Sequence, residues 1–222
     1  ETLFRSTKVF SACPAPTRTF ELKNMTQQMT TPTFDELLQI SADLHKHLCP
    51  RQVLGVRMGM AAGRWLGLAL PQTNKRLLTI VETDGCGADG IAVATGCWVG
   101  RRTLRVIDFG KMAATFIDTR SGTAVRITAN SAARELANFA APDAKNRWEA
   151  YLLGYQRMTD EELLNIEPVA LELSIPQLIS RPGVRVDCAR CGEEIINERE
   201  VMVGNEPWCK ACAGERYYRP LA

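Results

Sequence analysis

Four cysteines near the C-terminus constrain this 222-residue chain more than any other feature. They form two C-x-x-C pairs at these positions: Cys188 and Cys191, then Cys209 and Cys212. The spacing, with residues 192–208 between the pairs, is typical of a zinc module, because each pair directs two sulfurs at one ion. Gly192 supplies the backbone freedom that the first turn needs. We therefore predict a structural zinc finger over residues 184–222.

Both histidines of the chain lie in one short stretch, residues 45–50, with the sequence HKHLCP. Imidazole and thiolate are ligands that zinc, copper and iron-type ions prefer. If the stretch ends a helix, His45 and Cys49 lie on one face and reach one point in space. His47 joins them if the helix unwinds before Pro50. A core histidine with a buried free cysteine explains the pattern equally well, and both interpretations stay open.

A further thiol, Cys86, follows the strand pattern of residues 77–81 in a glycine-rich turn. We expect Cys86, Cys49 and either His45 or His47 to be candidate ligands of a core metal ion. Asp89 is expected to orient an imidazole or to bind weakly. Three protein ligands would leave one position open for water, as in catalytic zinc sites.

Three residues near the candidate ligands in the sequence are expected to have structural roles rather than to bind the metal. Asp84 is expected to serve the turn, Glu82 to be solvated at the end of the strand, and Cys97 to pack in the interior. A general base for metal-assisted hydrolysis cannot be identified from the sequence.

The composition is that of an ordinary folded protein. The hydrophobic share is 45% and the charged share 23%, and a formal net charge of +2 neither indicates nor excludes nucleic acid. No apolar run approaches the roughly 20 residues that a membrane helix requires, so no membrane partner is expected. Four of the eight cysteines belong to the zinc pattern and no signal peptide is recognisable. These observations favour a reducing, cytoplasmic location.

Local patterns predict helices first, a strand-rich middle and helices again, which indicates an α+β fold. The predicted helices are residues 34–44, after a capping box at Thr33, then 53–68, 91–95, 130–139, 143–153 and a short helix after the capping box at Thr159. The predicted strands, mainly antiparallel, are residues 77–81, 104–109, 113–118, 124–128 and 169–173. This core extends over residues 31–180, and residues 1–30 are expected to be a flexible tail or an upstream extension.

Glycines recur on one face of the second predicted helix, at Gly55, Gly59 and Gly63. Each glycine weakens a helix by up to about 1 kcal/mol relative to alanine, so the repeat needs a reason. We predict the close approach of another backbone, either within the core or across a dimer.

Residues 35–120 resemble the FmdE family, which takes its name from a component of formylmethanofuran dehydrogenase. The resemblance is carried by the HKHLCP stretch and the following GVRMG, by residues 82–89 around Cys86, by Thr95-Gly96-Cys97, by Gly100 and by residues 108–113. Lys46 and Arg51 stand where the family usually has glycine, and a long basic side chain there narrows the cleft or alters its charge. Members of this length often carry a C-terminal treble-clef zinc finger, which residues 184–222 resemble.

The resemblance implies a metal-binding auxiliary protein associated with a molybdenum or tungsten enzyme, whose redox chemistry belongs to other subunits. It also implies an α+β core that pairs into a homodimer. Zinc is expected in the finger, and a second zinc or another transition metal in the core. Two alternatives remain: a zinc-dependent, hydrolase-like enzyme that uses the core site, and a regulatory finger that binds RNA polymerase or nucleic acid. The acidic residues of the finger argue against nucleic acid.

Overall fold

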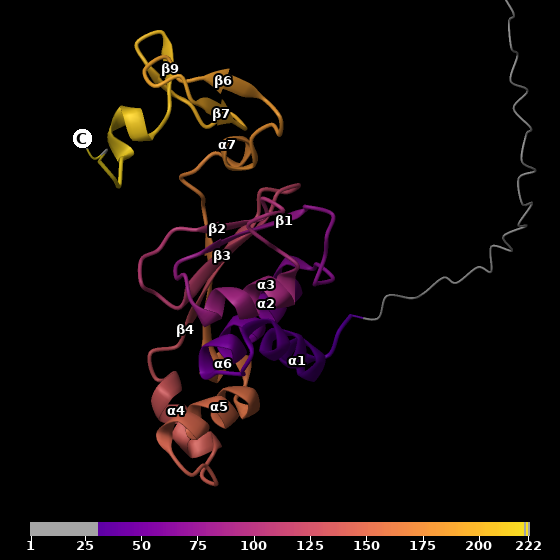
Figure 1. Cartoon of the computed structure of the whole chain (residues 1–222). Helices are drawn as coiled ribbons and strands as arrows, with labels where there is room; N and C mark the ends of the chain where they lie inside the picture. Colours follow the sequence, from indigo (N-terminus) through magenta and orange to yellow (C-terminus); the bar gives the residue numbers. More distant parts are fainter. Residues whose placement is uncertain (1–30, 220, 222) are drawn as a thin grey trace, which may run out of the picture. The chain divides into compact units, whose positions relative to one another are not determined.

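The computed structural model describes residues 31–219 and 221 (Figure 1). The expected flexible tail or upstream extension over residues 1–30 lies outside this part of the chain. The described residues form a mixed five-stranded sheet with its helices, followed by a small cysteine-rich module. The predicted α+β class is therefore confirmed. None of the described helices is long and apolar enough to cross a membrane.

The sheet order is β2-β1-β3-β4-β5, with β1 and β2 parallel and all other neighbours antiparallel. Its strands are β1 (Leu77–Val81), β2 (Leu104–Val106), β3 (Ala113–Asp118), β4 (Ala124–Ala129) and β5 (Leu164–Val169). The core helices are α1 (Phe34–His45), α2 (Pro50–Leu66), α3 (Cys86–Thr95), α4 (Ala133–Ala140), α5 (Arg147–Arg157), α6 (Asp160–Leu163) and α7 (Ile175–Ile179).

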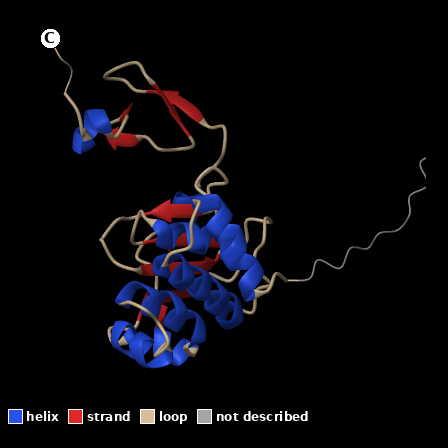
Figure 2. Ribbon diagram, turned by 60° about the horizontal axis from the view of Figure 1, so that its bottom comes forward, coloured by secondary structure: helices blue, strands red, loops and turns tan. Residues whose placement is uncertain are grey.

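Strand β1 is buried along its whole length because both faces of the sheet are covered. Successive side chains of a strand point to opposite faces. Leu77 and Val81 accordingly join the large hydrophobic cluster that includes α1, α2 and α3, and the helices of the core lie across the strands in Figure 2. Leu78 and Ile80 join a second cluster, which residues of the segment 169–178 cover.

Capping boxes were good predictors of helix starts. Both Thr33 and Thr159 accept a hydrogen bond from the backbone of the third helical residue, as predicted. The starts predicted for the next two helices, at residues 130 and 143, were wrong, although Asn130 Oδ1 accepts a hydrogen bond from the Ala132 N–H at 3.0 Å in the turn before α4. α4 begins three residues after Asn130, and Asn146 caps α5 in place of Asp143, which forms an ion pair with Arg157.

Two helices begin earlier than predicted, and one strand does too. α2 starts at Pro50, because a proline is tolerated in the first turn where its missing N–H has no helical partner. α3 starts at Cys86, so the second half of the glycine-rich turn is helical. β5 ends at Val169, where the last strand was predicted to begin, and α7 follows it.

Gly55 and Gly59 of α2 pack against α3 within the core, and Gly63 packs against Leu68 and Leu70. A Cβ added to Gly55 would lie 2.3 Å from the carbonyl oxygen of Gly87, and one added to Gly90 would lie 2.4 Å from that of Gln52. No side chain fits at such distances, so both helices need glycine where they cross. The predicted close approach is confirmed, and this face is not available for the contact of a dimer.

The C-terminal module consists of two hairpins and a helical turn (Figure 1). Its elements are β6 (Arg185–Asp187), β7 (Glu194–Ile196), β8 (Val201–Val203), β9 (Glu206–Trp208) and the turn Ala211–Glu215. The first cysteine pair lies in the β6–β7 turn, and the second pair lies between β9 and the first residues of the helical turn.

Candidate functional site

The two core thiols lie at the starts of two helices that pack tightly together. Cys49 is the residue before α2, and Cys86 is the first residue of α3. Because Gly55 contacts the first turn of α3, the two helices cross near their N-termini. The packing of the two helices at these glycines therefore brings Cys49 and Cys86, which are far apart in the sequence, close together in space.

A buried glutamine fixes the position of Cys49. Gln52 is fully buried, and its side-chain oxygen accepts a hydrogen bond from the Cys49 N–H at 2.8 Å. Its amide nitrogen donates to the carbonyl oxygen of Ser41 at 2.8 Å and to the Ser41 hydroxyl at 3.0 Å. These bonds tie the end of α1 to the start of α2, so Cys49 is held by the core.

His45, Cys86 and Asp89 form a chain of contacts. His45 Nε2 lies 3.1 Å from Cys86 Sγ, and His45 Nδ1 lies 2.9 Å from Asp89 Oδ2. A carboxylate only accepts hydrogen bonds, so it places the imidazole proton on Nδ1 and leaves the Nε2 lone pair facing the sulfur. Asp89 thus orients an imidazole, as the sequence predicted.

The expected geometry of the HKHLCP stretch was wrong in one respect. α1 ends at His45, and Lys46 takes a left-handed conformation with φ of 69°, so His45 and Cys49 do not share a helical turn. His47 is exposed, with its ring centroid 4.8 Å from that of His45. The structure therefore gives His45 the contact with Cys86, and a role for His47 as a ligand stays a prediction.

The neighbouring thiols differ in their surroundings. Burial raises the pKa of the Cys49 thiol, and the nearby Cys86 thiol adds to the rise. Cys97 is 2% exposed and its Sγ lies 3.4 Å from the carbonyl oxygen of Leu77, so it packs in the interior as expected.

Glu82 was expected to be solvated, and this expectation was wrong. Glu82 is 7% exposed, and Arg126 donates hydrogen bonds to both oxygens of the Glu82 carboxylate, at 2.6 and 2.7 Å. The Arg126 guanidinium holds the pKa of the Glu82 carboxyl below its usual value. A paired carboxylate of low pKa is a poor general base at neutral pH. Asp84 is exposed in the turn.

The four finger cysteines converge on one point. Their sulfur atoms all lie within 4.8 Å of one another, and the Sγ atoms of Cys191 and Cys209 are 3.9 Å apart. The backbone N–H of Cys209 donates to Cys188 Sγ at 3.2 Å and holds the pKa of Cys188 at about 6, which favours the thiolate that a metal binds. The group can bind a metal ion and fits a zinc finger. Within the described residues, His45, Cys49 and Cys86 do not form so compact a group.

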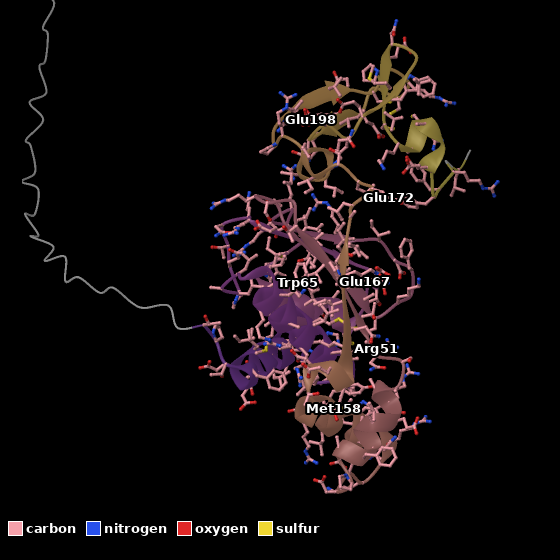
Figure 3. The ribbon with its side chains drawn as sticks, turned by 180° about the vertical axis from the view of Figure 1, so that it is seen from behind. Arg51, Trp65, Met158, Glu167, Glu172 and Glu198 are labelled. Carbon is pink, nitrogen blue, oxygen red and sulfur yellow. The ribbon has the colours of Figure 1, made fainter. Side chains whose placement is uncertain are left out.

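A cavity of about 700 Å³ opens onto the two core thiols. Cys49 and Cys86 line it together with Arg51, which lies in the first turn of α2 and is labelled in Figure 3. The expectation that a basic side chain alters the charge of the cleft is thus met by Arg51. Lys46 is not among its lining residues.

The other walls of the cavity were not foreseen from the sequence. They come from α4 and α5 and include Arg134, Arg147, Trp148 and Tyr151. No local pattern distinguishes these residues from the solvated face of a helix. Only the tertiary arrangement brings them to the thiols.

Replacing Lys46 by glycine should stabilise the protein by about 1 kcal/mol, because Lys46 has a positive φ that glycine adopts without strain. Arg51 is the matched control: it has helical geometry, and Arg51→Gly should destabilise by up to about 1 kcal/mol. Urea unfolding of both variants measures the two changes. A Lys46→Gly variant no more stable than wild type would contradict the strain argument.

Together these features define an α+β protein with a thiol–imidazole site in its core and a four-cysteine metal module at its C-terminus. A family model described as "FmdE, Molybdenum formylmethanofuran dehydrogenase operon" matches residues 44–165, more than half of the chain. The chain belongs to the FmdE family, as its sequence indicated.

Two known proteins are similar to this chain. A crystal structure of a tungsten formylmethanofuran dehydrogenase FmdE-like protein from Syntrophus aciditrophicus shares the fold, with a TM-score of 0.54, 22% identity, and coverage of 86% of this chain and 100% of that one. A probable S-adenosyl-L-methionine-binding protein of Archaeoglobus fulgidus is 30% identical over 216 residues. The match covers 89% of this chain but 57% of that relative, whose name describes the longer protein.

Proposed function

We propose that this chain is a metal-binding auxiliary protein in which the finger holds a structural zinc ion and the core holds a second transition-metal ion. Four thiolates in a closed group suit zinc, which prefers tetrahedral sulfur coordination in structural sites. The observation that carries the second ion is the contact of His45 Nε2 with Cys86 Sγ, beside Cys49.

His45, Cys49 and Cys86 would hold the core ion, and their donor set suits zinc or another borderline-soft metal. Asp89 supports the ligand His45 through the ring nitrogen on the far side from Cys86, Nδ1. A carboxylate at Nδ1 fixes the orientation of the ring and makes Nε2 a stronger ligand for the metal ion. When bound, such an ion supplies Lewis acidity at the cavity. The sequence offers His47 as an alternative ligand, which the same experiment can test.

The test is the metal content per chain, measured by elemental mass spectrometry after purification without chelators or nickel columns. Wild type should contain about two metal ions per chain, and Cys86→Ala or His45→Ala about one. His47→Ala is the matched control, since the exposed His47 has no contact with Cys86 among the described hydrogen bonds, and it should retain both ions. One ion in wild type and in every variant would refute the core site.

The arrangement of the same three residues also favours a second candidate function, nucleophilic catalysis by a cysteine. Cys86, His45 and Asp89 are arranged as a nucleophile, a base and an orienting carboxylate. In that role the Cys86 thiol gives its proton to His45 Nε2 and attacks an acyl carbon, forming a thioester. The leaving group departs with that proton, and water then hydrolyses the thioester.

Alkylation by iodoacetamide separates the two functions. In chelator-treated protein, a nucleophilic Cys86 should be alkylated rapidly near neutral pH, and His45→Ala should slow this reaction about tenfold or more. Protection of Cys86 in untreated protein, lost on chelation, would favour the metal site. Slow alkylation with or without chelator, unaffected by His45→Ala, would contradict the nucleophile.

The family description and the Syntrophus protein support a proposed association with a molybdenum or tungsten enzyme. Affinity purification of the tagged chain from its host, followed by molybdenum and tungsten analysis, tests this association, and an eluate without either metal would argue against it.

We propose a homodimer as well, and light scattering of the purified protein measures this oligomeric state. A reducing, cytoplasmic location is part of the same proposal, because it keeps thiols reduced, as the four convergent sulfur atoms of the finger need to be if they are to bind a metal.

A further inference from the structure

The cavity beside the core thiols carries an unusual excess of positive charge. Three arginines line it, Arg51, Arg134 and Arg147, and no aspartate or glutamate does. Within the described part of the chain, none of these arginines forms an ion pair with a carboxylate. Most other arginines of the core have such partners, as Arg57 has in Asp160 and Arg76 in Asp118. No carboxylate neutralises the three guanidinium groups, and Arg134 lies near the Tyr155 hydroxyl, so the arginines can pair with an anionic ligand.

Helix termini add to this charge. The first residues of four helices line the cavity: Pro50 of α2, Cys86 of α3, Ala133 of α4 and Arg147 of α5. A helix N-terminus carries a partial positive charge of about half an elementary charge, and its free N–H groups bind anions. Asn146 caps α5 and a capping box joins Cys49 to Gln52 at the start of α2, whereas α3 and α4 have no side-chain cap. The N-termini and the arginines thus favour the same kind of ligand.

Aromatic side chains provide an apolar wall. Trp148, Tyr151 and Tyr155 line the cavity from α5, and the rings of Tyr151 and Tyr155 stack with centroids 5.8 Å apart at 6°. Trp148 is 52% exposed, a large exposed area for an aromatic ring. Flat rings that face a cavity favour planar ligands, and guanidinium groups pair with carboxylate and phosphate.

We infer that the cavity binds a small organic anion, a ring compound with a phosphate or carboxylate group, and presents it to Cys49 and Cys86. The anionic group pairs with Arg134 and Arg147, and the ring packs on Trp148. A cavity of about 700 Å³ is large enough for such a molecule. This inference rests on the proposed function, since it names the class of compound that reaches the core site.

The position of Arg51 explains why the anion lies near the thiols. Arg51 is two residues from Cys49, in the first turn of α2, and lines the cavity beside the two thiols. Its side chain adds a third positive charge on the thiol side of the cavity. Arg51→Gly should therefore weaken binding of the anion while leaving the thiols in place.

The experiment is isothermal titration with four probes: phenyl phosphate, benzoate, inorganic phosphate and phenol. Phenyl phosphate, benzoate or both should bind at least about tenfold more tightly than phenol and than inorganic phosphate, because the anion and the ring contribute together. Tighter binding of phenyl phosphate or of benzoate identifies the anionic group. Phenol binding as tightly as both ring anions would overturn the inference, and so would inorganic phosphate binding as tightly as both ring anions.

Variants locate the site and keep it separate from the metal. Arg134→Gln and Arg147→Gln should each weaken the better ring anion about fivefold to tenfold, and Trp148→Ala about fivefold. Arg120→Gln, an exposed arginine outside the cavity, is the matched control and should bind as wild type does. Unchanged affinity in all three cavity variants would overturn the inference. Metal content should be unchanged in the arginine variants, so failure of anion binding and failure of the metal site give different results.

Discussion

Replacing Cys188 by serine should unfold the finger and leave the core domain folded. The buried hydrophobic cluster of the finger contains only Cys188, Ile195 and Cys212, with Val186 and Trp208 partly buried against it. Such a cluster cannot offset the loss of chain entropy in so small a unit. Structural zinc sites supply on the order of 10 kcal/mol of folding free energy, so loss of one ligand should be decisive.

Three measurements follow the finger and the core separately. Proteolysis should cut the variant within residues 184–222, metal content should fall by about one ion per chain, and the unfolding temperature of the core should stay near that of wild type. Trp208 is half-buried beside Cys209, so its fluorescence should move toward that of an exposed indole. These changes should appear together, because metal binding and folding of the finger are coupled.

Cys97→Ser is the matched control for this prediction. It makes the same sulfur-to-oxygen change at a buried cysteine of the core, away from the four finger ligands. It should destabilise the core by a few kcal/mol at most and retain the metal of the finger. A Cys188→Ser variant whose core melts at a much lower temperature would show that the core depends on the finger. An intact, metal-loaded finger would show that the ion is not held as proposed.

The finger could be predicted from the sequence because its information is local. The spacing of Cys188, Cys191, Cys209 and Cys212 already determines which sulfur atoms can meet at one ion. The helix starts at Thr33 and Thr159 were predictable for the same reason, since a capping box is contained within four residues.

The start of α3 was missed because tertiary packing overrides local preference there. Gly85, Gly87 and Gly90 give residues 82–90 the composition of a turn. In the structure the absence of Cβ atoms at Gly90 and at Gly55 of α2 allows α3 to contact α2, and the buried contact stabilises a helix that begins at Cys86. Propensity alone takes no account of this contact.

The core site was predictable in its residue types and less so in its geometry. Asp89 was expected to orient an imidazole, and it contacts His45 Nδ1. The pairing of His45, at the end of α1, with Cys86, at the start of α3, depends on the packing of these two helices, which no sequence spacing encodes. The arginines of α4 and α5 were missed for a related reason. Exposed arginines are common on helices, and only the tertiary structure shows that these arginines line the cavity.

Replacing Arg126 by methionine should destabilise the core by about 3 kcal/mol at pH 7, because it leaves the buried carboxylate of Glu82 without its partner. Arg126 lies on β4 and reaches across β3 to Glu82, which follows β1. The side chain of Glu82 is 9% exposed, so water cannot replace the two lost hydrogen bonds.

The loss should depend on pH in a definite direction. In wild type, Arg126 lowers the pKa of Glu82 below its ordinary 4.5, so the pair stabilises the fold above pH 4.5 and this contribution is lost as the pH falls through the folded-state pKa. In the variant, burial without the partner raises the pKa of Glu82, and protonation removes the unpaired charge. The difference in stability between the two proteins should therefore be largest at neutral pH and smaller at pH 4.

Urea unfolding of the core at pH 7 and pH 4 measures this prediction. Arg157→Met is the matched control, because it breaks the ion pair between Arg157 and Asp143, whose side chains are 42% and 59% exposed, and it should cost much less stability than Arg126→Met. The double variant Arg126→Met with Glu82→Gln should be more stable than Arg126→Met alone, since the unpaired charge is gone. If Arg126→Met costs no more than Arg157→Met, or if its deficit grows as the pH falls, the buried pair does not hold β1 and β4 in the way that the structure indicates.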